Sequence, residues 1–168
     1  MPTPDVDTEK MLQALLRHDV TFVVIGGFAV ELHEVPVAPT RDVDITPSAS
    51  RTNLVKLIGA LNELEARLRV AGGPAAGVAV PGGLTPEFLQ SMVSVALVTA
   101  AGPLDISLLP DGTEGYDDLA RSQLHIEFHN LRLPVASLDD IIRSKEAAGR
   151  EKDLLVLPAL REHLRRQR

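Results

Sequence analysis

Phe22-Val-Val-Ile-Gly-Gly-Phe-Ala-Val-Glu-Leu-His33 and Pro39-Thr-Arg-Asp-Val-Asp-Ile45 are the two stretches of sequence that decide the fold. The first begins with a β-branched apolar run, which predicts a buried strand, and the glycine pair ends that strand and opens a short helix. The second alternates acidic and apolar side chains, which predicts another strand. Together they predict two strands joined by a short helix and a loop, with the acids on the second strand.

The glycine pair Gly26-Gly27 predicts a place where phosphate could approach the main chain. Without side chains, glycines let phosphate oxygens reach backbone N–H groups at the start of a helix. A Gly-Gly pair after a strand is also compatible with a simple turn. This feature alone therefore does not establish a nucleotide site.

Three aspartates carry the chemistry that the sequence suggests. Asp42 and Asp44 lie two residues apart on a predicted strand, so both point to one face, and Asp105 lies on a later apolar strand. If the strands are adjacent, the three carboxylates meet, and their repulsion favours a bound Mg²⁺, with Mn²⁺ as an alternative. Separately, each acid could instead be a cap, an exposed edge residue or a turn residue.

Further helices and strands are predicted on both sides of this unit from helical apolar spacing and from β-branched runs. The predicted helices span 8–19, 50–70, 115–122, 137–149 and 150–166. The predicted strands span 92–99, 104–109, 124–128 and 131–135. A Gly- and Pro-rich loop is expected over 71–86, with an undetermined role, and Ser137 with Asp140 predicts a capping box.

This order of elements predicts an α/β (α+β) fold with a small mixed sheet, flanking helices and a helical C-terminus. We expect residues 1–136 to form the α/β core and residues 137–168 to add helices that complete the same single domain. A length of 168 residues and an apolar fraction of 45% fit one well-packed domain.

Composition and charge narrow the class of protein. The absence of cysteine excludes a disulfide scaffold and thiolate metal sites, and we expect a cytoplasmic protein that does not enter a membrane. The net charge is −6, yet residues 143–168 hold eight basic and four acidic side chains, which leaves nine basic and nineteen acidic ones elsewhere. That basic end is compatible with a docked polyanion or with a solvated last helix.

Lys145 falls on the inward stripe of its predicted helix, in line with Ile141, Ile142 and Ala148. A lysine there either extends outward to solvent or meets an anion, and the nearby acids and an expected triphosphate favour the anion. Asp153 lies on the inward face of the last helix. It is expected to pair with Lys145 or Arg150, or to accept a proton from an attacking hydroxyl.

The sequence resembles the DNA polymerase β-type nucleotidyltransferase superfamily. The Gly-Gly pair, the Thr40-Arg-Asp-Val-Asp44 motif and the later strand aspartate carry the resemblance. The run Lys145-Glu-Ala-Ala-Gly-Arg-Glu-Lys-Asp153 is similar to the AbiEii-like branch, which includes the MenT toxins of type IV toxin–antitoxin systems.

The resemblance implies transfer of a nucleoside monophosphate from an NTP to an acceptor hydroxyl, with release of pyrophosphate. It implies a nucleotide site formed by Gly26, Gly27, Thr40, Arg41, Lys145 and Arg150. It implies catalytic roles for Asp42, Asp44, Asp105, Lys145 and Asp153, with the metal held by Asp42, Asp44 and Asp105. For this branch the implied acceptor is the 3′ end of tRNA, the implied role is a translation-blocking toxin, and a cognate antitoxin is an expected partner.

Other interpretations remain open. The acceptor could be a protein side chain or an antibiotic, or the chain could be a non-catalytic regulator that keeps the fold. A P-loop, a dinucleotide-binding glycine motif and a nucleophile elbow are absent from the sequence. His125, Glu127 and His129 share one strand face as a possible zinc trio, but an amphipathic strand with a solvent-facing side is the favoured explanation.

Overall fold

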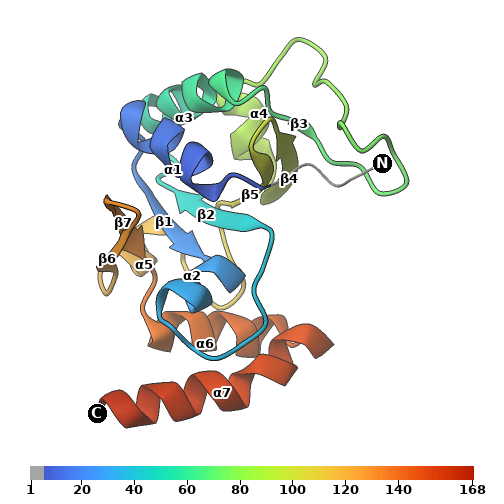
Figure 1. The fold of residues 1–168 in the computed structure, drawn as a ribbon. Helices are drawn as coiled ribbons and strands as arrows, with labels where there is room; N and C mark the ends of the chain where they lie inside the picture. Colours follow the sequence, from blue (N-terminus) through green and yellow to red (C-terminus); the bar gives the residue numbers. More distant parts are fainter. Residues whose placement is uncertain (1–5) are drawn as a thin grey trace.

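A seven-stranded mixed sheet runs through the protein and carries helices on both sides (Figure 1). The structure is a computed structural model that describes residues 6–168. Its strands are β1 (Phe22–Ile25), β2 (Val43–Pro47), β3 (Arg67–Leu68), β4 (Ser94–Thr99), β5 (Gly102–Ser107), β6 (Leu124–Phe128) and β7 (Leu131–Val135). They lie in the order β3-β4-β5-β2-β1-β7-β6.

The centre of the sheet sets the geometry that matters for function. β2 pairs antiparallel with β1 and parallel with β5, and the β2–β5 register places Asp44 beside Asp105. β4 and β5 form a tight hairpin that extends the sheet to β3. Because register partners point to the same face, both carboxylates leave the sheet on one side while Val43, Ile45, Leu104 and the other alternate residues enter the core.

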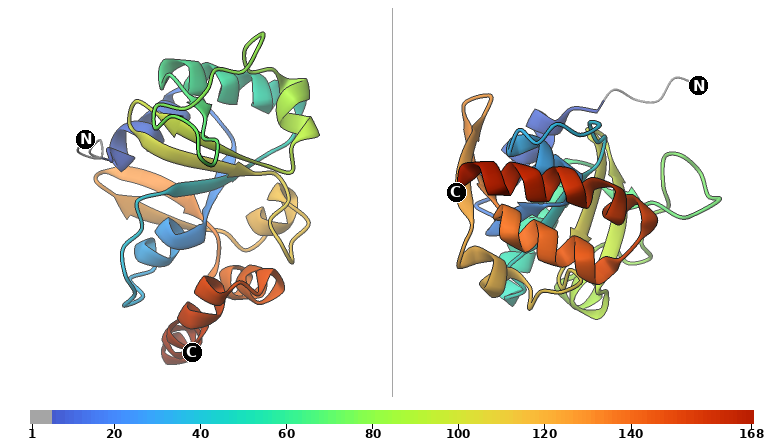
Figure 2. Two further views of the ribbon diagram at one scale, coloured as in Figure 1. Left: turned by 90° about the vertical axis from the view of Figure 1, so that its right-hand side faces the viewer. Right: turned by 90° about the horizontal axis from the view of Figure 1, so that it is seen from below.

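Helices flank the sheet on both sides. They are α1 (Thr8–Arg17), α2 (Gly26–Leu32), α3 (Arg51–Glu63), α4 (Pro86–Ser91), α5 (Tyr116–Ala120), α6 (Leu138–Ala148) and α7 (Glu151–Gln167). α1, α3 and α4 lie together on one side of the sheet, whereas α2 lies toward α6 and α7 on the other (Figures 1 and 2). Seen from below, α6 and α7 run side by side across the base of the molecule (Figure 2).

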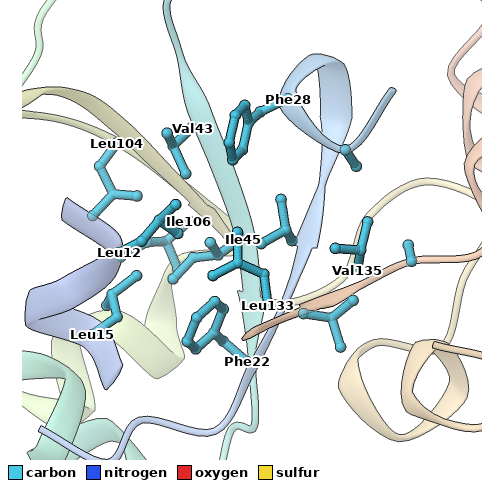
Figure 3. Packing of buried hydrophobic residues seen from close by; sticks show 14 of the residues in the cluster. Leu12, Leu15, Phe22, Phe28, Val43, Ile45, Leu104, Ile106, Leu133 and Val135 are labelled. Carbon is cyan, nitrogen blue, oxygen red and sulfur yellow. The ribbon is translucent and has the colours of Figure 1, made fainter. Parts of the chain in front are cut away.

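The hydrophobic core fills the space between the sheet and α1. Leu12 and Leu15 of α1 point toward Ile45, Leu104 and Ile106 on the central strands (Figure 3). All five side chains are at most 2% exposed. Burial of such side chains is the main stabilising contribution, at roughly 1.5–3 kcal/mol each. The paired aspartates therefore stand on a rigid platform.

The predicted α/β fold with a mixed sheet and helical C-terminus is confirmed. The two hairpins, the first strand and the helix that opens at Gly26 lie close to their predicted positions. Ser137 caps α6 by accepting from the N–H of Asp140, as predicted. The reciprocal half of the predicted capping box is different, because the Asp140 carboxylate accepts instead from Ser122 and Arg143.

The long helix predicted over 50–70 is wrong in its second half. α3 ends at Glu63, Glu65 adopts a left-handed conformation with φ 54°, and the chain then forms β3 against β4. Pairing with the sheet edge outweighs the helical spacing of the leucines. The prediction also missed α4, which Thr85 caps and Pro86 opens.

The predicted division at residue 136 stays a prediction. α6 packs both on α2 of the core and on α7. Across residues 6–168, no helix has the length and apolarity that a membrane crossing requires.

Asn53 anchors α3 to the strand region and provides a test of this fold. Its side chain accepts from the N–H of Thr21 and donates to the carbonyls of Thr21 and Ser48 at 2.7–2.9 Å, and the residue is 5% exposed. Asn53→Ala leaves these groups unpaired, so we expect it to lower the free energy of unfolding by about 3 kcal/mol in urea titrations. Asn62→Ala, exposed on the same helix, is the control, and equal losses in both variants would contradict this role.

Candidate active site

A cavity of about 430 Å³ opens where β1 ends and β2 begins, beside β5 and between the sheet and the α6–α7 pair. Three groups of side chains line it. An acidic floor is formed by Asp42, Asp44 and Asp105, a basic wall by Lys145, Arg150 and Lys152, and an apolar wall by Val93 and Leu109. The predicted cluster of three aspartates therefore does face one cavity.

Asp44 and Asp105 form the centre of the acidic floor. They are register partners on the parallel strands β2 and β5. Burial, together with the charge of Asp105 and a hydrogen bond to it, and to a lesser extent the charge of Asp42, raises the pKa of Asp44 to about 7. The pair is thus electrostatically unfavourable when both groups are ionised, and a cation between them would relieve it.

Gly26 approaches this pair from β1. It has φ 69°, and a Cβ placed on it would lie 2.1 Å from Oδ2 of Asp44. Only glycine provides both the left-handed conformation and the space at this point. The first residue of the predicted glycine pair is therefore a close backbone neighbour of the buried carboxylate rather than a simple turn residue.

The donor set suits a hard divalent cation that also binds substrate. In residues 6–168, no three histidine or acidic side chains are grouped closely enough to hold a metal ion unaided. Mg²⁺ is typically held by one or two carboxylates together with water and substrate phosphates, which is what Asp44 and Asp105 offer. Asp42 lies close enough to raise the pKa of both of them, and its place as a metal ligand stays a prediction.

Arg69, which sequence reasoning missed, contacts the acidic floor directly. Its Nη2 donates to both oxygens of Asp105, at 2.9 and 3.1 Å. Burial raises the pKa of Asp105, and Arg69 opposes that rise. The residue follows β3, a two-residue strand inside the region predicted as helix, so no signal in the sequence pointed to it.

The basic wall comes from the junction of α6 and α7. Nε of Arg150 lies 2.7 Å from Oδ2 of Asp153, and Nζ of Lys145 lies 3.5 Å from its Oδ1. Burial opposes ionisation of the Asp153 side chain, which is 2% exposed, but its two cationic partners hold its pKa below the ordinary value. The predicted ion pair is present with both partners, whereas a proton-accepting role for Asp153 stays a prediction.

The remaining residues predicted to bind nucleotide do not line the cavity of the described part of the chain. Across residues 6–168, the lining does not include Gly27, Thr40 or Arg41. The hydroxyl of Thr40 accepts from the N–H of Asp42 at 3.2 Å, and its own N–H donates to Glu31 of α2. Thr40 and Glu31 therefore position the acidic strand, and nucleotide contacts of Thr40, Gly27 and the exposed Arg41 stay predictions.

The residues of the possible zinc trio, at and just after β6, are not grouped as metal ligands within the described residues. His125, Glu127 and His129 are all exposed, and the ring of His129 instead stacks on Phe128. Nδ1 of His129 also lies 3.2 Å from Glu9. The solvent-facing strand favoured by the sequence is what the structure has.

Solved structures share this arrangement of sheet and helices. The lincosamide antibiotic adenylyltransferase LnuA, bound to lincomycin, matches with a TM-score of 0.60 and 19% identity over 94% of this chain and 98% of that one. The antibiotic-resistance factor ANT(2'')-Ia matches with a TM-score of 0.59 and 14% identity over 93% of this chain and 81% of that one. A putative nucleotidyltransferase (TM1012) from Thermotoga maritima matches with a TM-score of 0.51 and 20% identity, over 94% and 90% of the two chains.

These likenesses show that the protein has the nucleotidyltransferase fold. The chain belongs to the family described as nucleotidyltransferase of unknown function (DUF6036), whose sequence model matches residues 5–159. No curated protein matches its sequence. The predicted nucleotidyltransferase superfamily and enzyme class are thus confirmed, whereas these comparisons do not assign the chain to the AbiEii-like or MenT branch.

The raised pKa of Asp44 predicts how metal-free protein responds to pH. Between its ordinary pKa of 3.8 and about 7, Asp44 is protonated in the folded chain but ionised in the unfolded chain. This group therefore makes the free energy of unfolding fall as pH rises through that window. Asp44→Asn removes the buried charge. In EDTA, we expect its stability relative to wild type to improve by about 2–4 kcal/mol between about pH 4.5 and about pH 8.5 in urea titrations.

Glu127→Gln, on the exposed face of β6, is the control for the pH series and should show no such change. A pH-independent difference between Asp44→Asn and wild type would contradict the buried, mutually repelling pair.

Gly26→Ala tests the close approach of the backbone to Asp44. Gly72 has a similar φ of 75°, but a Cβ added to it would meet nothing within 4 Å, so Gly72→Ala carries the conformational strain without the collision. We expect Gly72→Ala to cost about 1 kcal/mol of stability and to leave nucleotide binding intact. Gly26→Ala should cost clearly more stability and should weaken nucleotide binding. Urea titration and calorimetric nucleotide binding measure both, and identical behaviour of the two variants would count against the contact.

Proposed function

We propose that the protein transfers a nucleoside monophosphate from an NTP to the hydroxyl of an acceptor, with Mg²⁺ bound by Asp44 and Asp105. The observation that carries the proposal is the pairing of these two buried carboxylates at the floor of a cavity with a basic wall. Asp42, directly before β2 and lining the same cavity, is proposed as a further ligand. Membership in a nucleotidyltransferase family supports the reaction type.

Each wall of the cavity has a role in this reaction. Lys145 and Arg150 lie where they can neutralise the charge of a triphosphate and of departing pyrophosphate. Bare backbone at Gly26 lets a phosphate approach the carboxylate pair closely. The metal, when bound, polarises the α-phosphate and lowers the pKa of the acceptor hydroxyl.

The covalent step exchanges one phosphoester bond for another. The acceptor oxygen forms a bond to the α-phosphorus, the bond from that phosphorus to the pyrophosphate oxygen breaks, and pyrophosphate leaves. Asp105 is proposed to take the proton of the acceptor hydroxyl, because its carboxylate lies beside Asp44 on the floor of the cavity. Alignment of the two substrates supplies most of the rate enhancement.

The charges of the cavity favour a neutral or cationic small-molecule acceptor. Six aspartates and three basic residues line it, and this excess of acidic side chains disfavours a polyanionic acceptor. The basic residues of α7, which a docked polyanion would contact, are partly paired, since Arg161 contacts Glu146 while Arg165 and Arg166 share Glu162. Relatives of the same fold support this class, because LnuA was solved with lincomycin and ANT(2'')-Ia with adenylyl-2''-tobramycin.

The 3′ end of tRNA, the toxin role and a cognate antitoxin stay predictions of the sequence resemblance. They share the proposed chemistry and differ only in the acceptor. Cytoplasmic location likewise stays an expectation.

The proposal is tested by transfer of label from each of the four α-³²P-labelled NTPs in the presence of Mg²⁺. We expect label on an aminoglycoside or lincosamide hydroxyl rather than on tRNA or protein, and no label from EDTA-treated reactions. Asp44→Asn should lower the rate at least about a hundredfold, whereas Asp117→Asn, an exposed acid on α5, should retain it. Label on tRNA would show the same chemistry with the predicted RNA acceptor, and no label on any acceptor would contradict the proposal.

A further inference from the structure

Arg69 stands where a second cation would be expected. Its Nη2 lies within 3.1 Å of both carboxylate oxygens of Asp105, the residue beside Asp44 on the acidic floor. The guanidinium thus takes up lone pairs on both oxygens that a metal ion would use. Its side chain is 39% exposed, so it can move into solvent without disturbing the packing of the core.

The backbone of Arg69 is held while its side chain is free to move. Its N–H donates to the carbonyl of Ala96 on β4, opposite Asp105 in the β4–β5 register. The residue lies between β3 and the Gly- and Pro-rich segment 71–86, which extends away from the body of the molecule (Figure 2). The guanidinium of Arg69, after β3, and the carboxylate of Asp105, on β5, therefore meet across the intervening strand β4, and rotation about side-chain bonds alone can separate them.

We propose that Arg69 is a resident counter-cation that occupies the Asp105 side of the metal site and must be displaced when the metal ion and nucleotide enter. This inference rests on the proposed function. Because Arg69 and the metal ion compete for the carboxylate of Asp105, metal binding there depends on a substrate whose phosphates supply further ligands. Arg69 is thus a positioning residue that acts through Asp105, and it limits unproductive metal binding by the empty enzyme.

Manganese titration of the intact protein tests the competition without catalysis. Free Mn²⁺ is followed by its EPR signal, first alone and then with a saturating nonhydrolysable ATP analogue, and no acceptor is added. We expect Arg69→Gln to bind Mn²⁺ about fivefold more tightly than wild type in the absence of the analogue, which is the effect of losing one partly exposed ion pair. The difference should shrink when the analogue is present.

Two further variants separate competition from a general effect of charge or folding. Arg67→Gln removes an equal charge two residues before Arg69, on β3, where Nε donates to the carbonyl of Gly77, and should bind Mn²⁺ as wild type does. In an Asp105→Asn background, Arg69→Gln should bring no gain, because the shared carboxylate is gone.

The outcomes distinguish this inference from the proposed function. Equal or weaker Mn²⁺ binding by Arg69→Gln, with wild-type binding intact, would overturn the inference and leave the transferase proposal standing. A gain that persists in the Asp105→Asn background would also overturn it. Failure of wild type to bind Mn²⁺ even with the analogue would contradict both.

Discussion

The parallel pairing of β2 with β5 forces two carboxylates, Asp44 and Asp105, to share one partly buried position. Charge repulsion in such a place is costly, and it is visible in the raised pKa of Asp44. The apolar partners on the opposite face hold both strands in register, so the pair cannot relax by sliding. The neighbouring residues of the cavity accommodate this repulsion or offset it with positive charge.

The surroundings respond to the two acids at different distances. At closest range the bare backbone of Gly26 adds no bulk, and Arg69 supplies one positive charge from the far side of β4. Farther away, Lys145 and Arg150 are held by the buried carboxylate of Asp153, which keeps their charge facing the cavity. The cavity thus combines cationic side chains suited to phosphates with an excess of acidic ones, and a hydroxyl acceptor is proposed to bind in it.

Much of this arrangement could be predicted because it depends on local pattern. The strand–Gly-Gly–helix unit, the alternation around Asp42 and Asp44, and the lone acid at 105 follow from two-residue and helical periodicities, and the structure brings them to one cavity. The part that could not be predicted comes from long-range pairing. Leu64 and Leu68 continue a helical spacing, yet hydrogen bonds to the edge of β4 convert this segment into β3, and with it place Arg69 at the site.

The two central strands are neighbours in space but are far apart along the chain, since α3, β3, α4 and β4 lie between them. Parallel strands cannot be joined by a tight turn, and closing such a long loop is a slow event in folding. During synthesis the ribosome must therefore release β5 before Asp44 gains its neighbour, and the helices that carry Lys145 and Arg150 emerge later still. A nascent or truncated chain that stops before β5 has neither the repulsion nor the chemistry, so the charged centre comes into being only when most of the polypeptide has already been made.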